Sequence, residues 1–390
     1  MNASVQAPLA GVTVLDLSRV LAGPYCTMIL ADLGARVIKV ENPRGGDDSR
    51  AYGPFVQGVS AYFMSVNRGK ESIALDLKAA PDRQLFESIL PGVDVLVENF
   101  RPGTMEKLGY GWEQLRARHP SLIYAATSGF GHTGPYRDRA AYDMVVQAMG
   151  GIMSLTGQPN SPPTRVGTSI GDIVAALFTA IGIVSALYDR RTGGCGRKID
   201  VSMLDCQVAI LENAVARFAA LGEVPGPIGA RHPSITPFAA FQAADGFIVI
   251  AAGNDELFRR LCDVLGLAAL ALDPRFSTNP ERTRNHAALA IQIESALLRG
   301  SVTQWLDRLT DAGVPCSPIN SIDQTLNDPQ VRARNMVAYS DDPVAGRLVM
   351  AGNPIKMTGL ADPAERPAAP RLDSDRARIV QQFGRGGAAG

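Results

Sequence analysis

Short apolar runs alternate with segments of helical spacing over the first two hundred residues, and this pattern constrains the fold most strongly. The runs are strand-like and cover residues 12–16, 36–41, 72–76, 94–100 and 122–130. Helical spacing follows in residues 22–34 and 81–90. Strands separated by helices of roughly ten to fifteen residues indicate βαβ units. We therefore predict an α/β fold with a mostly parallel sheet.

The carboxyl ends of these strands are the predicted place for a ligand. In open parallel sheets, ligands bind beyond the carboxyl ends of the strands. The loops expected at that edge cover residues 17–23, 41–47, 99–103 and 128–134.

Proline and glycine mark a predicted boundary after residues 173–220, which read as two long helices. The breaking residues are Pro225, Gly226, Pro227 and Gly229. A smaller α/β unit follows, with a hairpin that turns at Asp245 and Gly246 and helices near residues 256–265, 286–298 and 303–312. We predict a large domain begun by residues 1–224, a small α/β domain at 225–320, and a return segment at 321–390 that completes the large domain.

The charge balance and the cysteines exclude several classes of protein. With 38 basic and 38 acidic residues, no general field favours nucleic acid or an anionic membrane, so an anionic ligand needs a local cluster. The longest apolar run, residues 173–187, is shorter than the roughly 18–20 residues that span a bilayer and predicts a buried helix. Five cysteines without a C-x-x-C pair predict reduced thiols, and the N-terminal segment shows no secretory signal. We expect a cytoplasmic protein.

No helix expected in this sequence begins with a familiar cofactor motif. No G-x-G-x-x-G opens a helix, and there is neither a G-x-x-x-x-G-K-[ST] nor an H-E-x-x-H motif. The histidines share no ligand spacing: His119, His132, His232 and His286. We expect no metal and no nucleotide cofactor.

Residues 167–171 fit the pattern G-x-S-x-G ahead of a long apolar helix. In hydrolases that pattern forms a nucleophile elbow, which would make Ser169 a nucleophile. Acidic residues and two histidines lie downstream, so thioester hydrolysis through Ser169 stays open.

Asp172 follows that pattern directly and has two interpretations. As an N-cap, its carboxylate would accept hydrogen bonds from the free N–H groups of the helix. As a nucleophile, the same carboxylate would be desolvated between Gly167 and Gly171 in an apolar wall and would attack a thioester. Both interpretations remain open from the residues alone.

Residues 97–103 (VENFRPG) supply aromatic, amide and cationic groups at a strand end, and Lys107 follows. Such a set suits a phosphate-bearing nucleotide. Further positive charge is available from Arg44, Lys70 and Lys78, although a solvated loop has the same composition.

Ten ordered blocks give the chain a recognisable likeness. They are AGP, GARVIKVENPRGGDDSR, NRGKESIALDLK, DVLVENFRPGTMEKLG, SGFGHTGP, AYDMVVQAMGGIMSLTG, RVGTSIGDIVAALFTAIGIVSALY, VSMLDC, GARHPSITPF and GVPCSPI. From about residue 9 to residue 361 the chain resembles the family III CoA-transferases, also called the carnitine dehydratase/bile-acid-inducible F family.

This resemblance implies a two-domain subunit and a reaction. The large domain would be Rossmann-like and contain both chain ends, and two ring-shaped subunits would interlock as a homodimer. Asp172 would be the nucleophile that carries CoA as an aspartyl thioester, without metal or nucleotide cofactor, and Ser169 would be incidental. Acyl-CoA and a small carboxylic acid would be the substrates.

The resemblance also carries CoA-contacting positions onto this chain: Leu21, Ala22, Leu75, Lys78, Asn99, Phe100, Arg101, Lys107, Tyr142 and the adjacent Asp143. One position departs from the formyl-CoA transferases, because Asn42 stands where they have an arginine. Arg44 is the candidate substitute.

The sequence blocks also indicate which branch of the family the chain resembles. The racemase branch pairs a histidine with its aspartate, whereas residues 141–143 read AYD here, so a transferase is preferred. SGFGHTGP and RVGTS look most similar to the acetyl-CoA:oxalate branch, and GARHPSI is shared with succinyl-CoA:dicarboxylate (glutarate-type) enzymes. We expect CoA transfer from acetyl-, formyl- or succinyl-CoA to a small dicarboxylate such as oxalate. Arg165, or Arg231 with His232, is the candidate for its second carboxylate.

Overall fold

The computed structural model describes residues 6–384, so residues 1–5 and 385–390 lie outside the described part of the chain. The N-terminal segment in which we expect no secretory signal begins with residues 1–5 and therefore lies partly outside the described residues. The chain divides into two compact units. Unit 1 comprises residues 1–152, 165–216 and 329–390, and unit 2 comprises residues 153–164 and 217–328. Residues 153–164 thus group with unit 2 although they lie inside the predicted segment 1–224.

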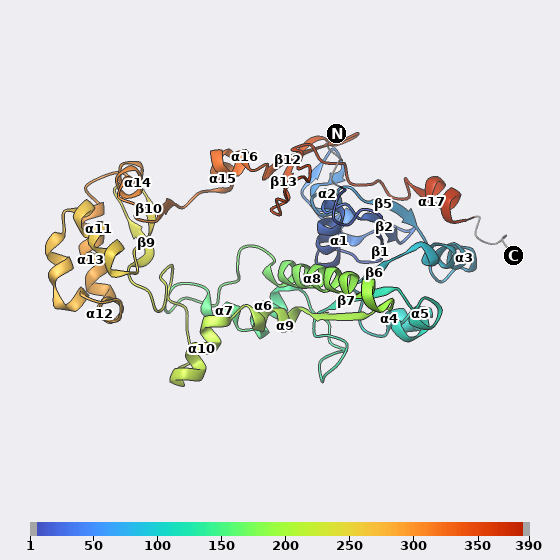
Figure 1. Ribbon diagram of the computed structural model, residues 1–390, viewed down its shortest axis with the longest axis horizontal. Coiled ribbons are helices and arrows are strands. Elements are labelled where there is room, and N and C mark those ends of the chain that lie inside the picture. Colours follow the sequence, from blue (N-terminus) through green and yellow to red (C-terminus); the bar gives the residue numbers. More distant parts are fainter. Residues whose placement is uncertain (1–5, 385–390) are drawn as a thin grey trace. The chain divides into compact units, whose positions relative to one another are not determined.

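Unit 1 is built on a six-stranded parallel sheet in the order β5-β2-β1-β6-β7-β8 (Figure 1). Its strands are β1 (Thr13–Asp16), β2 (Arg36–Glu41), β5 (Glu71–Ala74), β6 (Val95–Glu98), β7 (Ile123–Ser128) and β8 (Lys198–Ser202). The predicted α/β fold with a parallel sheet is confirmed, and the five predicted strands end within two residues of their expected bounds.

Helices cover both faces of this sheet because both faces of its central strands are apolar. On β1, Val14 packs into one hydrophobic core and Leu15 into the other. The first core lies under α1 (Ala22–Asp32) and α8 (Ile170–Gly193), and the second under α3 (Ala80–Ile89), α5 (Trp112–Arg118) and α17 (Arg376–Phe383). The C-terminal α17 packs beside α3 and β5 (Figure 1). Double burial explains why the strands read as continuous apolar runs.

Shorter elements complete unit 1. They are α2 (Ala61–Asn67), α4 (Thr104–Leu108), α6 (Asp143–Met149), α9 (Met203–Ala209), α16 (Pro329–Ala333), the 3₁₀ helices η1 (Asp48–Ala51) and η2 (Leu90–Gly92), and the strand pairs β3 (Phe55–Val56) with β4 (Val59–Ser60) and β12 (Val337–Asp342) with β13 (Gly346–Ala351). Helices α7 (Ile152–Leu155) and α10 (Glu212–Leu221) cross the boundaries between the units.

The region 173–220 is where the element prediction is wrong. Instead of two long helices it holds most of α8, the edge strand β8, α9 and most of α10. Helix α8 has 24 residues, and its most apolar 18-residue window has a mean hydropathy of 2.1, so by length and composition it could cross a membrane. The expectation that the apolar segment is too short to span is therefore corrected. Half of that window is buried, and α8 packs against α1, β7 and β8, which is the setting of a core helix.

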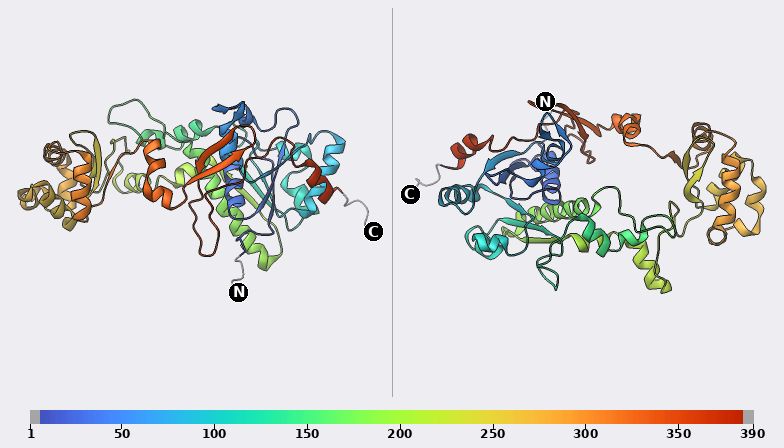
Figure 2. Two further views of the ribbon diagram at one scale, coloured as in Figure 1. Left: turned by 90° about the horizontal axis from the view of Figure 1, so that it is seen from above. Right: turned by 180° about the vertical axis from the view of Figure 1, so that it is seen from behind.

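Unit 2 contains a three-stranded antiparallel sheet in the order β11-β10-β9. The strands are β9 (Phe238–Gln242), β10 (Phe247–Ala251) and β11 (Cys316–Pro318), and the predicted hairpin turn at Asp245 and Gly246 joins the first two. Figure 2 shows the helices gathered on one side of this sheet: α11 (Asp255–Leu265), α12 (Asn279–Arg284), α13 (His286–Leu297) and α14 (Val302–Asp311). The 3₁₀ helices η3 (Ala268–Leu272) and η4 (Pro274–Phe276) and the helix α15 (Ile322–Asn327) complete the unit.

Candidate active site

A cavity of about 200 Å³ opens at the carboxyl ends of the central strands of unit 1. The loop after β1, the loop after β6, the end of β7 and the first turn of α8 all contribute to its lining. The lining residues from these elements include Arg19, Val20, Leu21, Ala22, Asn99, Phe100, Arg101, Ser128 and Asp172. The sequence predicted that the loops after β1, β6 and β7 share one edge of the sheet, and the structure confirms it; the first turn of α8 was not part of that prediction.

Asp172 lies in the first turn of α8, which begins at Ile170 after Ser169 at the N-cap position. The carboxylate is therefore not the N-cap of the helix, and that interpretation is wrong. Among residues 6–384, no side chain or backbone group hydrogen-bonds or ion-pairs with the Asp172 carboxylate. Burial, and then the negative charge of Asp143, raise the pKa of Asp172 to about 7. A half-buried carboxylate without such partners is a poorly solvated and reactive group.

Asp143 and Gly171 set the position of that first turn. The N–H of Gly171 donates to Oδ1 of Asp143 over 2.8 Å, and the other carboxylate oxygen accepts from Nε2 of Gln147 over 2.8 Å. A Cβ at Gly171 would lie 2.7 Å from Cγ2 of Val146 and 3.0 Å from Oδ1 of Asp143. Glycine is thus required here because α6 and α8 meet too closely for any side chain.

The elbow interpretation of Ser169 is wrong for a structural reason. A nucleophile elbow is a sharp turn between a strand and a helix. In the described residues, no strand lies between β7 and Ser169, and the segment directly before it is irregular. Ser169 lines a separate cavity of about 920 Å³ beside α1 and α8 rather than the cavity that contains Asp172.

The predicted CoA-contacting residues fall into two groups. Six of these ten residues line the cavity together with Asp172: Leu21, Ala22, Asn99, Phe100, Arg101 and Tyr142. The other four, which include Asp143, do not line it. Leu75 is buried in the core, and Lys78 and Lys107 are exposed on the loop after β5 and on α4.

Two arginines that the sequence reasoning missed also line the cavity. Arg137 and Arg139 follow the SGFGHTGP block, and the guanidinium of Arg139 lies 4.7 Å from the ring centre of Tyr136. With Arg19 and Arg101 they place four guanidinium groups at an opening that holds only Asp48 and Asp172 as acids. Arg19 is paired with Asp48 at 2.9 Å. The sequence R-D-R at residues 137–139, between the blocks SGFGHTGP and AYDMVVQAMGGIMSLTG, could have indicated these two arginines.

Tyr62 on α2 was likewise missed. Burial, and then the negative charge of Asp172, raise the pKa of Tyr62 to about 12, so its hydroxyl stays protonated beside the aspartate. The ring of Tyr52 packs edge-on against it at 6.0 Å. Tyr62 lines the larger cavity together with Ser169, and not the cavity that contains Asp172.

The candidates for binding a second carboxylate lie in different units. Arg165 is in unit 1, with its guanidinium 3.8 Å from Oδ2 of Asp143. Arg231 and His232 belong to unit 2, where the imidazole stacks on Phe238 at 5.5 Å. Asn42 accepts a hydrogen bond from the backbone N–H of Arg44 and does not line the cavity.

Comparison with known proteins identifies the family. The profile of CoA-transferase family III matches residues 9–376. The chain belongs to CoA-transferase family III. The resemblance drawn from the sequence blocks is therefore confirmed, and this family III chain is an enzyme, a CoA-transferase.

Relatives of this family III chain span nearly its whole length. Acetyl-CoA:oxalate CoA-transferase of Acetobacter aceti is 49% identical over 382 residues, which are 98% of this chain and 97% of that protein. Succinate–glutarate CoA-transferase of Agrobacterium fabrum is 39% identical over 383 residues, covering 96% of both. The crystal structure of a CAIB/BAIF family protein from Brucella suis superimposes with a TM-score of 0.85 at 39% identity, over 97% of this chain and all of that one.

Proposed function

We propose that this enzyme transfers CoA from a short acyl-CoA to a small dicarboxylate, with Asp172 as the nucleophile. The observation that carries the proposal is the position of Asp172: a half-buried carboxylate without hydrogen-bond partners among the described residues, in a cavity lined by the loops after β1 and β6. Family membership supports the reaction class.

The proposed cycle exchanges groups on one carboxylate. Asp172 attacks the thioester carbonyl, so that the C–S bond breaks and a mixed anhydride and the CoA thiolate form. The thiolate attacks the aspartyl carbonyl and releases the first acid, which leaves an aspartyl-CoA thioester. The incoming carboxylate then displaces the thiolate as a second anhydride, and the thiolate attacks its acyl carbon to release the new acyl-CoA and free Asp172.

No metal or nucleotide cofactor is required by this cycle. Each step replaces one activated acyl derivative by another, so no external energy source is needed. The guanidinium groups of Arg19, Arg101, Arg137 and Arg139 provide the local positive charge that the charge-balanced chain needs for an anionic substrate. We assign these groups to the phosphates and carboxylates of the substrates.

We place the donor and acceptor among small acids, with acetyl- or formyl-CoA and oxalate first. A cavity of about 200 Å³ suits a short acyl group. The 49% identical relative is named for acetyl-CoA and oxalate, and the 39% identical relative for succinate and glutarate. Succinyl-CoA:glutarate-type transfer is therefore the second candidate.

The homodimer is also part of the proposal. Helix α8 exposes an apolar stripe along one face, with Leu177, Ile181 and Val184 exposed by 43%, 60% and 41%. We propose that a second copy covers this stripe in an interlocked pair of Rossmann-like subunits, as the family resemblance implies. Sedimentation velocity at decreasing concentration is expected to show a dimer that persists until unfolding. A folded and active monomer would refute the interlocked arrangement.

A panel assay tests the proposed reaction. The enzyme is incubated with one acyl-CoA (acetyl-, formyl- or succinyl-CoA) together with one acid (oxalate, glutarate or a monocarboxylate). Each combination is a separate reaction, and its CoA products are identified by mass spectrometry. The expected result is a new dicarboxyl-CoA with the released acid in equal amount. Free CoA without a new thioester would indicate hydrolysis instead, and isomerised acyl-CoA would indicate a racemase.

A further inference from the structure

The turn that joins β1 to α1 has a strained backbone at Val20. Its φ is +67°, in the left-handed region that β-branched residues rarely occupy. Val20 and its neighbour Leu21 line the cavity that contains Asp172. The shape of this strained turn therefore determines part of the wall around the proposed nucleophile.

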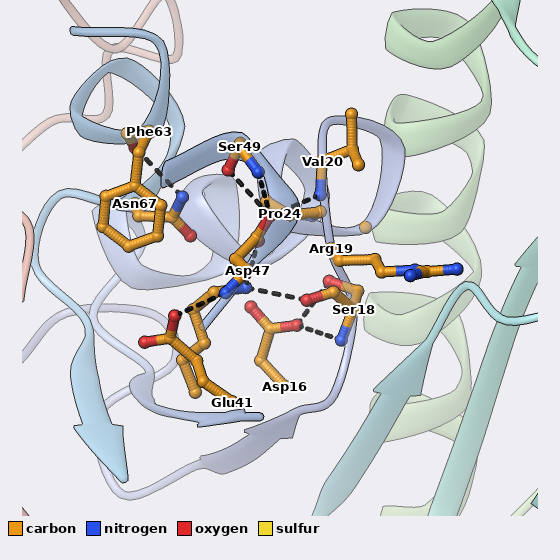
Figure 3. Close-up of polar contacts among 12 residues, drawn as sticks. Asp16, Ser18, Arg19, Val20, Pro24, Glu41, Asp47, Ser49, Phe63 and Asn67 are labelled. Atoms are coloured by element: carbon orange, nitrogen blue, oxygen red, sulfur yellow. Dashed lines mark hydrogen bonds and ion pairs between the residues drawn. The ribbon is translucent and has the colours of Figure 1, made fainter. Parts of the chain in front are cut away.

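Side chains from distant elements hold the backbone of this turn (Figure 3). The N–H of Val20 donates to Oδ1 of Asp47 over 3.0 Å. The N–H and carbonyl of Arg19 pair with the amide of Asn99 over 2.9 and 2.8 Å. The carbonyl of Ser18 accepts from Nζ of Lys39 over 2.7 Å. A conformation that a valine avoids is thus fixed by partners on three other segments.

Lys39 connects these supports from beneath the turn. Its ammonium lies 2.8 Å from Oδ2 of Asp47, and both side chains are almost fully buried. Burial lowers the pKa of Lys39, but the carboxylates of Asp16, Asp47 and Glu41 more than offset it, so the ammonium remains charged. Without Lys39, the carboxylate of Asp47 would be buried beside the turn without the cation that pairs with it.

A second buried cation holds the start of α1. Nζ of Lys70 lies 3.1 Å from Oδ2 of Asp16 and donates to the carbonyl of Pro24 over 3.0 Å. Asp16 in turn accepts from the N–H of Ser18 over 2.9 Å. The turn is consequently fixed at both ends, and Lys39 is the group that acts on its centre through Asp47.

We propose that Lys39 is a positioning residue for CoA transfer: through Asp47 and the Ser18 carbonyl, it holds the Val20 turn in the conformation that forms the wall of the Asp172 cavity. This inference rests on the proposed function, because it takes that cavity as the place of the exchange. Lys39 itself touches no substrate in this account.

The test compares two buried ion pairs of unit 1. Lys39→Met removes the cation under the turn. Arg68→Met is the matched control, because Arg68 pairs with Asp32 at 2.6 Å with side chains 3% and 10% exposed, and its other hydrogen bond goes to the carbonyl of Ala351 rather than to the turn. Melting temperatures and steady-state exchange are measured for both variants at a temperature where circular dichroism shows them folded. We expect Lys39→Met to lower kcat/KM by at least about tenfold, since small displacements of a site are costly. The control is expected to lose stability and keep kcat/KM within about twofold.

A rescue variant separates positioning from a general structural role. Glycine adopts a φ of +67° without strain. The double variant Lys39→Met/Val20→Gly should therefore have a kcat/KM at least about threefold higher than that of Lys39→Met, because the turn no longer needs the support. If Lys39→Met does not fold, Asp47→Glu is used instead, which keeps the charge but moves the acceptor away from the Val20 N–H, and the same loss is expected.

Equal kinetic losses in Lys39→Met and Arg68→Met, or no rescue by Val20→Gly, would overturn the proposal. The proposed function is checked in the same experiment with Asp172→Asn. An inactive Asp172→Asn together with an unaffected Lys39→Met would refute the positioning role alone, whereas an active Asp172→Asn would refute the proposed function itself.

Discussion

Replacing Asp172 by asparagine should make the enzyme more stable and inactive at the same time. The ionised carboxylate is half-buried without a partner among the described residues, and burial and the charge of Asp143 raise its pKa from 3.8 to about 7. The folded state therefore binds a proton more tightly than the unfolded state. Stability from this group is fully present below about pH 4 and is lost as the pH rises through about 7. Asparagine carries no charge, so the variant avoids this loss.

The size of the effect follows from the shift in pKa. A gap of about three units corresponds to at most about 4 kcal/mol, at about 1.4 kcal/mol per unit. Solvent reaches the half-buried carboxylate and screens part of this cost. The positive end of α8 also stabilises the anion by about 0.5 kcal/mol. We therefore expect Asp172→Asn to raise the free energy of unfolding by about 1–2 kcal/mol at pH 8.5, and by less at pH 5.5.

Urea unfolding at those two pH values measures the effect, and Asp205→Asn is the matched control. Asp205 occupies the same position in the first turn of α9, but it is exposed. Its replacement should lower the free energy of unfolding by about 0.5 kcal/mol at both pH values, as for a charge near a helix N-terminus. An Asp172→Asn variant that is less stable than the parent at high pH would refute the electrostatic account of the site.

Three further predictions concern activity. Since the attacking form of Asp172 is the carboxylate, kcat/KM should increase with pH and level off above about 7. Asp143→Asn should move this rise to lower pH, because it removes a neighbouring negative charge. A pH–rate profile that is the same in Asp143→Asn would contradict the coupling between the two carboxylates. Ser169→Ala should retain at least about half of the exchange rate, because Ser169 lines the other cavity; a loss of several powers of ten would restore the hydrolase interpretation. Arg139→Gln should raise the KM for acyl-CoA about tenfold with little change in kcat, as expected when a charged contact to a bound anion is lost; an unchanged KM would remove Arg139 from the binding site.

The sheet was predictable from the sequence because its information is local. Each buried strand is a short apolar run, and the loops at the carboxyl ends follow from the parallel arrangement. The edge strand β8 was not predictable in this way, because the exposed Asp200 and the half-buried Lys198 interrupt its apolar pattern.

The details of the site depend on contacts between distant segments and could not be read from the order of residues. Asp143 meets Gly171 across 28 positions, and Lys39 meets Ser18 across 21. The first turn of α8 was misplaced by three residues, because Ser169 and Asp172 are both favourable N-cap residues and only the path of the chain decides between them.

Covalent trapping of the thioester between Asp172 and CoA tests the central claim most directly. With acyl-CoA present, hydroxylamine should convert the aspartyl thioester to a hydroxamate, and borohydride should reduce it, while Asp172→Asn serves as the blank. Peptide mapping by mass spectrometry is expected to place both mass changes on Asp172. Modification of Ser169, or unmodified Asp172 in an enzyme that is turning over, would contradict the mechanism.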